Sequence, residues 1–250
     1  MEKFIKNIFI IIVFFNIINT VLFAGNFLNE QKRYSRVRTA IEEKDNIIKN
    51  TLKNNNIKLE ELNILITAYK EENILEIYAK NKSDSIYKKI ASYNIAAKSG
   101  ILGPKRMEGD LQVPEGFYYI DRFNPASSYY LSLGINYPNE SDKKKSNAKR
   151  LGGDIFIHGN NVTIGCLPMT DDKIKEIYLY ALYSKDNGQN RIPVYIFPFK
   201  MNEENINHYQ KYYNKSIINF WENIKKGYNI FQNTKKELII KTDSNGNYIF

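Results

Sequence analysis

Residues 152–166 read GGDIFIHGNNVTIGC and contain the only cysteine of the chain, Cys166, and one of its two histidines, His158. A run rich in isoleucine and phenylalanine ends at His158, a glycine and a short polar turn follow, and Gly165 directly precedes the cysteine. This alternation predicts a strand, a turn and a second strand. The turn is short enough to fold His158 back beside Cys166.

A thiol beside an imidazole is a candidate for nucleophilic catalysis. Because free cysteine has a pKa of about 8.5, it is only partly thiolate at neutral pH. A histidine within hydrogen-bond reach can accept the thiol proton and later return it to a leaving group. Gly165 would let the backbone approach a substrate closely and leave amides free for an oxyanion hole. The alternative is an inert cysteine packed as a small apolar side chain, with a structural histidine at a strand end.

The composition excludes several other classes of site. A single cysteine rules out a disulfide framework within the chain and any Cys-rich zinc module. The second histidine, His208, lies 50 positions after His158 in a polar helical stretch, where we expect a surface residue. We therefore expect no metal site and no cofactor. With 250 residues, of which 43% are hydrophobic, the chain is long enough for a core in one or two domains. These values exclude wholesale disorder and a polytopic membrane protein.

The N-terminal segment 1–24 has the features of a secretory signal peptide. Lys3 and Lys6 supply a positive start, residues 8–23 are mostly apolar, and Ala24 begins a small-residue site for a signal peptidase. An uncleaved membrane anchor is the alternative, although the apolar run falls just short of the roughly 20 residues that a spanning helix needs. In either case we expect the rest of the chain to be exported to the periplasm or cell envelope. A lone exported thiol is then inert, paired between chains or reactive.

The chain is basic, with 36 lysines and arginines against 27 acidic residues and a formal net charge of +9. Removal of residues 1–24, which contain two lysines and one glutamate, lowers this charge to +8. In an exported protein such a charge favours an anionic wall or membrane surface over nucleic acid. We expect no nucleic-acid partner, and membrane contact only if the N-terminal segment stays uncleaved. Lysines that merely solvate the surface explain the charge equally well.

Turn-forming residues concentrate in the middle of the chain. All seven prolines and ten of the thirteen glycines lie between residues 100 and 198, where we expect loops that carry function. Hydrophobic periodicity predicts helices over 28–54, from Thr170 onward and over about 203–232. Alternating patterns, the first two joined as a hairpin, predict strands over 63–70, 74–80, 87–97, 116–123, 129–135, 154–158 and 193–197. Residues 139–150 are typical of a solvated loop, and residues 243–246 of a hairpin turn.

These elements together predict an α+β or mainly β domain. In the C-terminal helix, Phe220, Ile224 and Phe231 could dock the tail onto the core. Trp221 would lie nearby on the helix surface.

His158-Gly159 followed by Thr163-x-Gly165-Cys166 resembles the catalytic signature of the YkuD-type L,D-transpeptidases, in which a base histidine and a spacer precede Ser/Thr-His-Gly-Cys. The pattern fits the YafK-like murein L,D-transpeptidase branch, and this resemblance covers most of the chain after about residue 35. Here Ile164 replaces the histidine before Gly-Cys, Leu167-Pro168 replace the Arg or Asn that commonly follows the nucleophile, and the spacer is shorter. All three differences fit this branch. Further segments that resemble it are 103–105, 108–118, 124–130, 165–171, 197–201 and 220–228.

The resemblance implies a domain organisation around an L,D-transpeptidase-like β-sandwich. The catalytic domain would span residues 59–201, after a signal peptide or anchor at 1–24 and an N-terminal helix at 25–58. Residues 202–250 would form a helical C-terminal extension packed on the core. The fold class would be α+β, with a mainly β catalytic core, a long N-terminal helix and a helix after the nucleophile.

The resemblance also implies a mechanism. Cys166 would attack the carbonyl of a bond from an L centre to a D centre in a peptidoglycan stem, forming a thioester as the terminal D-residue leaves. His158, oriented by the carbonyl of Gly159, would act as general base and then as general acid. The amides of Gly165 and Cys166 would bind the oxyanion. An amine acceptor would form a crosslink or a protein-to-wall link. Water would hydrolyse the thioester, the direction associated with the YafK-like branch, which cuts a protein off the wall.

The candidates for substrate binding are Arg106, Glu108, Asp110 and Thr163. The first three could bind the ammonium and carboxylate ends of a stem peptide, or they could fix a Gly- and Pro-rich loop by salt bridges. The partners implied are peptidoglycan stem peptides and a wall-attached protein. Two functions of another class stay open: a non-catalytic wall-binding protein in which Cys166 is structural, and a cysteine peptidase that acts on proteins.

Overall fold

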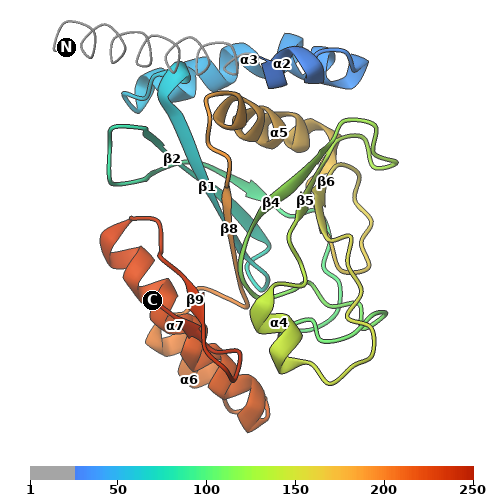
Figure 1. The fold of residues 1–250 in the computed structure, drawn as a ribbon, viewed down its shortest axis with the longest axis vertical. Helices are drawn as coiled ribbons and strands as arrows, with labels where there is room; N and C mark the ends of the chain where they lie inside the picture. The colour runs from blue at the N-terminus through green and yellow to red at the C-terminus, as the bar shows by residue number, and fades with distance from the viewer. Residues whose placement is uncertain (1–25) are drawn as a thin grey trace, which may run out of the picture.

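The structure is a computed structural model that describes residues 26–250, so the signal segment predicted at 1–24 lies outside the described residues. Its centre is one mixed sheet of eight strands in the order β3-β2-β1-β8-β4-β5-β6-β7. The sheet is curled, and helices cover it from two sides (Figure 1). The α+β class with a mainly β core is therefore confirmed.

The first three strands form an antiparallel meander. β1 (Leu62–Tyr69) pairs with β2 (Ile74–Asn81), which in turn pairs with β3 (Lys88–Asn94). Tyr69 lies opposite Ile74, so the predicted hairpin is confirmed.

The remaining strands extend the sheet toward the segment that holds the candidate site. β8 (Pro193–Phe197) lies between β1, to which it is parallel, and β4 (Gly116–Asn124), to which it is antiparallel. β5 (Ser132–Ile135), β6 (Phe156–His158) and β7 (Leu167–Pro168) follow in that order. A shift of register between β4 and β5 bends the sheet at this point. β5 and β6 are shorter than the ranges predicted for them.

On one face of the sheet lies α5 (Thr170–Asp186), and α2 (Asn26–Gln31) and α3 (Ser35–Asn54) pack on α5 from outside (Figure 1). The prediction of one continuous helix over 28–54 is wrong, because the chain turns between α2 and α3. The guanidinium of Arg38 stabilises that turn by donating to two of its backbone carbonyls, at 2.9 and 2.8 Å. Among the helices of the described residues, none is long and apolar enough to cross a membrane.

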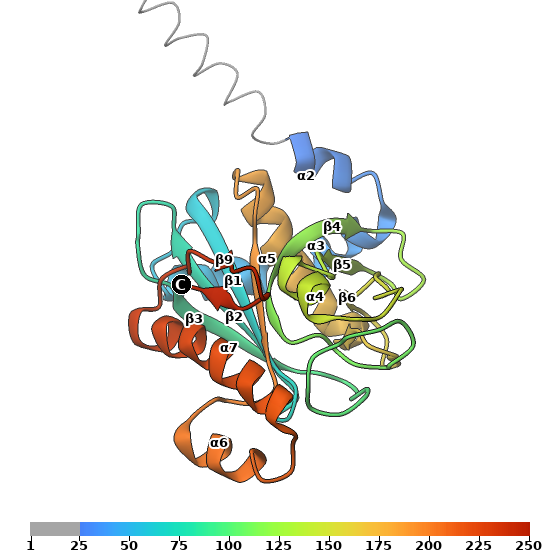
Figure 2. The same cartoon turned by 60° about the horizontal axis from the view of Figure 1, so that its bottom comes forward.

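The opposite face is covered by the C-terminal extension (Figure 2). Its helices are α6 (Glu203–Tyr209) and α7 (Lys215–Thr234), and a small hairpin of β9 (Lys241–Thr242) and β10 (Tyr248–Ile249) follows. The pattern over 203–232 predicted a single helix. The chain instead begins a new helix at α7, where an asparagine side chain caps the first turn by accepting from a backbone N–H 3.0 Å away.

Alternate side chains of the central strands face two separate cores, as the two-residue period of a strand requires. In β1, Ile64 and Ile66 belong to the core beneath α3 and α5. Leu65 and Tyr69 belong to the core beneath α7. Full burial of one such large apolar side chain contributes about 1.5–3 kcal/mol, so the sheet is stabilised from both faces.

α7 docks through the side chains that the sequence pattern predicts, since Phe220, Ile224 and Phe231 are all buried. Trp221 is buried as well, with 1% of its surface exposed, so its predicted place on the helix surface is wrong. Its indole N–H donates to Glu115 Oε2 at 2.8 Å. The helical pattern could not indicate this contact, because the partner lies on a distant segment of the chain.

A short helix, α4 (Glu140–Lys145), lies within the segment 139–150 that we expected to be a solvated loop. Asn139 and Asp142 form a capping box at its start, in which each side chain accepts the backbone N–H of the other. The Ser141 hydroxyl donates to a carbonyl of the C-terminal hairpin. α4 therefore connects the sheet to the C-terminal extension.

Candidate active site

Cys166 directly precedes β7 and lies beside the strand that carries His158. β6 and β7 are parallel, with Ile157 opposite Leu167, so Cys166 lies beside Phe156. The backbone N–H of Phe156 points at the thiol sulfur, 3.4 Å away. The strand that ends at His158 and the residue before β7, Cys166, are therefore neighbours in the sheet.

The loop between the two strands is held by Thr163. Its hydroxyl accepts hydrogen bonds from the amides of Gly165 and Cys166, at 3.1 and 2.8 Å, and donates to the carbonyl of Cys166 at 2.8 Å. The two amides that we expected to be free for an oxyanion are therefore bonded to a side chain in this structure. Thr163, which we considered for substrate binding, here positions the loop that carries the thiol.

The imidazole of His158 is buried and oriented. Its Nδ1 lies 2.5 Å from the carbonyl oxygen of Gly159; because a carbonyl only accepts hydrogen bonds, Nδ1 carries the proton and Nε2 is left as an acceptor. The ring of Tyr129 lies over the imidazole, with the two centroids 4.8 Å apart. Burial lowers the pKa of His158, although its bond to the Gly159 carbonyl offsets part of that effect. The imidazole is therefore neutral at neutral pH.

The Cys166 thiol is half-buried and contacts the backbone of β6 and of the chain before it. Besides the N–H of Phe156, the carbonyl oxygen of Asp154 lies 3.6 Å from Sγ. Burial raises the pKa of the thiol, and the Phe156 N–H and the charge of Lys105 offset only part of that rise. Within residues 26–250 the thiol has no hydrogen bond to an imidazole, and these pKa directions favour a neutral thiol and a neutral imidazole at rest.

Gly165 is the point at which a second loop approaches the nucleophile. Its φ is +135°, and a Cβ added here would lie 3.0 Å from the carbonyl oxygen of Gln112. A side chain would be strained in this conformation and would press on the backbone of that loop. The segment 102–115, which carries the other substrate-binding candidates, is therefore packed against the site.

Two of these candidates hold the segment 102–115 itself. Asp110 pairs with Lys105 at 2.6 Å and accepts from three backbone N–H groups of the same loop, and Glu108 pairs with Arg150 at 2.8 Å. Although burial alone would raise the pKa of Asp110, Lys105 and these N–H donors hold it below its usual value. These salt bridges and hydrogen bonds fix the loop, which is one of the two roles that we expected for these residues.

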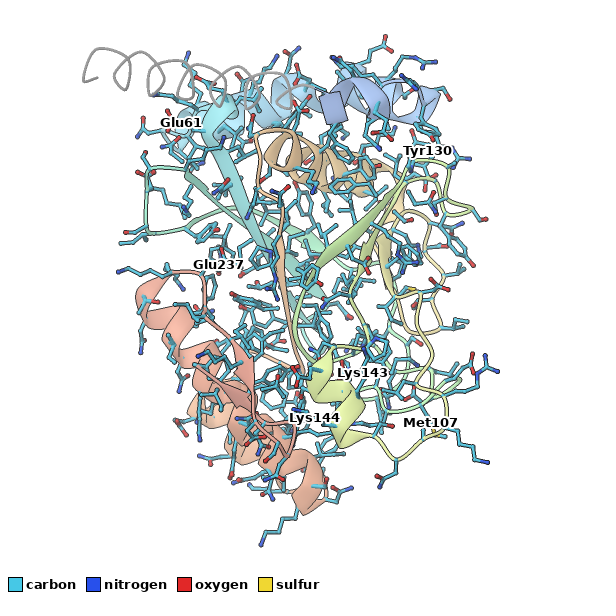
Figure 3. All side chains as sticks on the ribbon, in the orientation of Figure 1. Glu61, Met107, Tyr130, Lys143, Lys144 and Glu237 are labelled. Atoms are coloured by element: carbon cyan, nitrogen blue, oxygen red, sulfur yellow. The ribbon has the colours of Figure 1, made fainter. Side chains whose placement is uncertain are left out.

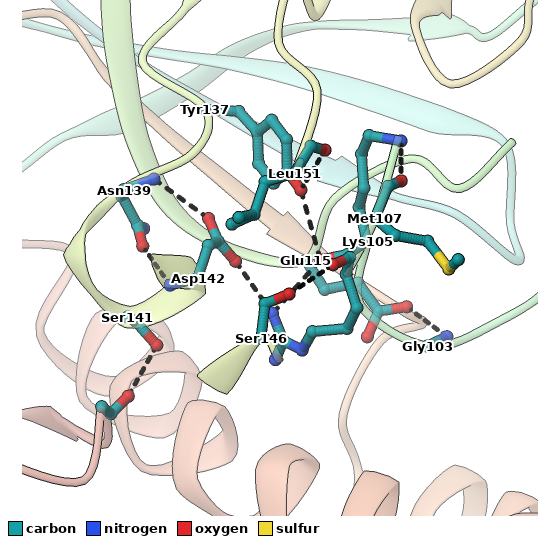
Figure 4. A network of polar contacts seen from close by, with 12 residues as sticks. Gly103, Lys105, Met107, Glu115, Tyr137, Asn139, Ser141, Asp142, Ser146 and Leu151 are labelled. Atoms are coloured by element: carbon teal, nitrogen blue, oxygen red, sulfur yellow. Dashed lines mark hydrogen bonds and ion pairs between the residues drawn. The ribbon is translucent and has the colours of Figure 1, made fainter. Parts of the chain in front are cut away.

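Arg106 links the segment 102–115 to both α4 and the C-terminal extension. Its guanidinium donates to Asp142 at 3.0 Å and lies over the ring of Phe220, 4.9 Å from the centroid. Asp142 also accepts the hydroxyl of Tyr118 at 3.0 Å. Figure 4 shows its capping box with Asn139 at the start of α4. Burial raises the pKa of Asp142 to about 6, in spite of Arg106. The sequence pattern gave no reason to single out Asp142, because its partners come from other segments.

A buried ion pair anchors the segment 102–115 from beneath. Lys70 Nζ lies 2.8 Å from Glu115 Oε1 and donates to two backbone carbonyls of the segment. Glu115 also accepts the indole N–H of Trp221, so β1, the segment and α7 meet at one carboxylate. No local signal could have identified Lys70 or Trp221, because neither has a partner nearby in the sequence.

The described residues contain no group of three or more His, Cys, Asp or Glu side chains placed to hold a metal ion. His208 lies in α6, and its ring is packed beside Tyr209 of the same helix. Figure 3 shows Met107, the neighbour of Arg106, and Tyr130, the neighbour of the ring over His158, on the same side of the molecule.

Residues 63–196 match the family model of the L,D-transpeptidase catalytic domain, YkuD. The chain belongs to this family. It is also 37% identical over 188 residues to the protein described as "Putative L,D-transpeptidase YafK" in Escherichia coli strain K12, a match that covers 74% of this chain and 73% of that protein. The protein of the same description in Escherichia coli O157:H7 matches equally. The predicted membership of the YkuD family and its YafK-like branch is confirmed.

Two solved structures resemble this L,D-transpeptidase family member at lower identity. The helical cell shape determining protein Pgp2 of Campylobacter jejuni is 19% identical, with a TM-score of 0.43 over 74% of each chain. Bd1075 of Bdellovibrio bacteriovorus is 20% identical, with a TM-score of 0.40 over 71% of this chain and 74% of that one. Identities this low do not transfer residue roles.

Proposed function

We propose that this family member is an exported enzyme whose Cys166 attacks peptidoglycan stem peptides and forms a thioester with them. The observation that carries the proposal is the contact between His158 Nδ1 and the Gly159 carbonyl. It leaves Nε2 as an acceptor, and the pairing of β6 with β7 brings the strand that ends at His158 beside Cys166, so the imidazole would receive the thiol proton. Peptidoglycan is the substrate that family membership supports.

Proton transfer accompanies substrate binding in this proposal. Burial raises the pKa of the Cys166 thiol and lowers that of His158, so a thiolate–imidazolium pair is disfavoured at rest. When the carbonyl of the L-to-D bond lies against Sγ, the proton moves to Nε2 as the S–C bond forms. The leaving amine then takes that proton from His158, and the acyl group stays on Cys166 as a thioester.

The oxyanion of each tetrahedral intermediate needs hydrogen-bond donors. The amides of Gly165 and Cys166 lie next to the sulfur, but both donate to the Thr163 hydroxyl at rest. An ionised acceptor binds an N–H group more strongly than a neutral hydroxyl does. Rotation of the Thr163 side chain away from the two amides, as the oxyanion develops, would therefore be favoured.

The thioester has two possible fates. An amine acceptor gives an L,D-crosslink or a protein-to-wall link, and water gives hydrolysis of stem-peptide or protein–peptidoglycan bonds. Both fates use Cys166 and His158 in the same way. Digestion of purified sacculi separates them, because new crosslinks score transpeptidation, whereas released stem peptides or released protein score hydrolysis.

Intact-protein mass spectrometry after incubation with stem peptides tests the nucleophile. We expect the wild-type chain to gain the mass of the acyl group and Cys166→Ala to gain nothing. No adduct, together with identical muropeptide profiles for the two proteins, would indicate a non-catalytic wall-binding protein. Cleavage of casein but not of muropeptides would indicate a cysteine peptidase. Cell fractionation of chains with and without residues 1–24 tests export to the periplasm.

A further inference from the structure

A cavity of about 300 Å³ lies between the segment 102–115 and the first turns of α7. Two cations line it, Arg106 and Lys145, and none of its lining residues is acidic. Its apolar lining includes Leu102, Ile217 and Phe220. Lys145 belongs to α4, in the stretch that we expected to be a solvated loop, so only the fold brings the two cations together.

The two cations leave an excess of positive charge at this cavity. Arg106 is balanced by Asp142, 3.0 Å away, whereas Lys145 donates to the neutral side-chain amide of Asn247 at 2.7 Å. Burial and the charge of Arg106 lower the pKa of Lys145, and Asp243 of the C-terminal hairpin offsets this only in part. A lysine ammonium beside another cation is stabilised when an anion approaches it. The charge of the cavity therefore favours an anionic ligand.

The cavity adjoins the nucleophile loop through Gln112. This residue lines the cavity, and its carbonyl oxygen lies 3.0 Å from the position of a Cβ on Gly165, the residue before Cys166. An extended peptide advances about 3.3–3.6 Å per residue. The C-terminal residue that leaves extends by one such step from a carbonyl held at Cys166, and Gln112 is the residue that connects the cavity with the nucleophile loop.

We propose that Arg106 and Lys145 bind the terminal carboxylate of the stem peptide, on the residue that leaves when the attacked bond breaks. This inference rests on the proposed function, because it takes a stem peptide as the ligand. A guanidinium and an ammonium are suited to a carboxylate through charge-assisted hydrogen bonds. Phe220 and Ile217 would contact the small side chain of the same residue, which gives the C-terminal extension a part in substrate selection.

The test is a calorimetric titration of the Cys166→Ala protein, which cannot form the thioester, with two peptides. One is a stem tetrapeptide with a free terminal carboxylate, and the other is the same peptide with a terminal carboxamide. Adding Lys145→Gln should raise the Kd of the free acid about tenfold, the effect of one charge-assisted hydrogen bond, and leave the Kd of the amide unchanged. Lys144→Gln is the matched control, because Lys144 pairs with Glu140 and does not line the cavity.

The outcomes separate this inference from the proposed function. Equal Kd values for the two peptides, or equal losses in Lys145→Gln and Lys144→Gln, would overturn the carboxylate site even if the wild-type chain forms a thioester. Failure of both peptides to bind, with no thioester on the wild-type chain, would overturn both proposals. Arg106→Lys keeps a cation in the cavity and should still bind the free acid more tightly than the amide. If this variant loses that preference while its melting temperature is unchanged, the guanidinium of Arg106 alone would account for the preference. That result would contradict a site shared with Lys145.

Discussion

Replacing Lys70 by methionine isolates the buried ion pair beneath the segment 102–115. Methionine keeps most of the volume but removes an ammonium that contacts Glu115 Oε1 at 2.8 Å and the carbonyls of Gly103 and Val113 at 2.8 and 3.0 Å. The side chains of Lys70 and Glu115 are 7% and 0% exposed, so water cannot replace the lost donor. Breaking a buried pair by removing one partner costs about 3–5 kcal/mol. We expect the free energy of unfolding of Lys70→Met to fall by about this amount.

Urea unfolding followed by tryptophan fluorescence measures this loss. Trp221 is the only tryptophan of the chain, is buried and donates to Glu115, so its emission reports on the same cluster. Lys89→Met is the matched control. Lys89 pairs with Glu76 at 3.2 Å but is 53% exposed, so water can take its place and its loss should cost less than that of Lys70.

A second substitution in the cluster separates charge from packing. Lys70→Met combined with Glu115→Gln should recover part of the lost stability, because the uncompensated charge is removed while an amide oxygen can still accept from Trp221. Thioester formation should slow in Lys70→Met, since the segment 102–115 would be less firmly held against the nucleophile loop. The reasoning is refuted if the Lys70 and Lys89 variants lose the same stability, or if the double variant is less stable than Lys70→Met alone.

Three further predictions follow from contacts at and near the site. Thr163→Val removes the hydroxyl that bonds two amides of the nucleophile loop, so urea unfolding should show a free energy of unfolding lower by about 1–3 kcal/mol. Thr163→Ser keeps the hydroxyl and should be close to wild type. Equal stability of all three proteins would contradict a structural role of the hydroxyl. As the pH is lowered, the rate of thioester formation should begin to fall only at pH values below about 6.5, the ordinary pKa of histidine. Burial lowers the pKa of His158, and the neutral imidazole must accept the thiol proton. A rate that already falls at a pH above about 6.5 would contradict the burial argument. Burial raises the pKa of Asp142 to about 6, so the folded protein binds a proton at this carboxyl more tightly than the unfolded chain does. The free energy of unfolding should therefore rise by about 3 kcal/mol as the pH falls from about 6 toward 4, and fall again as the pH rises. Unfolding curves of wild type and Asp142→Asn across that range would measure this, and an unchanged pH dependence in the variant would count against it.

Elements with a strong local pattern were predictable from the sequence. The hairpin of β1 and β2 and the helix α5 follow from alternation and from helical periodicity, because each pattern records which side of an element is buried. His158 and Cys166 could be singled out because the chain has one thiol and two imidazoles. Their glycine neighbours and short spacing placed them on one strand–turn–strand unit.

Breaks and short helices were not predictable, because each depends on a few specific side-chain contacts. The turn after α2 is held by the guanidinium of Arg38, and α4 begins where Asn139 and Asp142 cap each other. Such contacts leave little trace in hydrophobic periodicity. Trp221 was placed wrongly for a related reason, since its buried partner comes from another segment.

Residue types and spacing alone were enough to indicate which thiol and which imidazole are available and to which family the chain belongs. Tertiary structure alone decided what surrounds them: the parallel pairing of β6 with β7, the bonds from Thr163 to the two amides, and the meeting of Arg106 with Lys145 at one cavity. Hydrogen bonds require atoms about 3 Å apart. Residues tens of positions apart reach that distance only when the sheet and α7 bring their segments together, and no local pattern records such a distance.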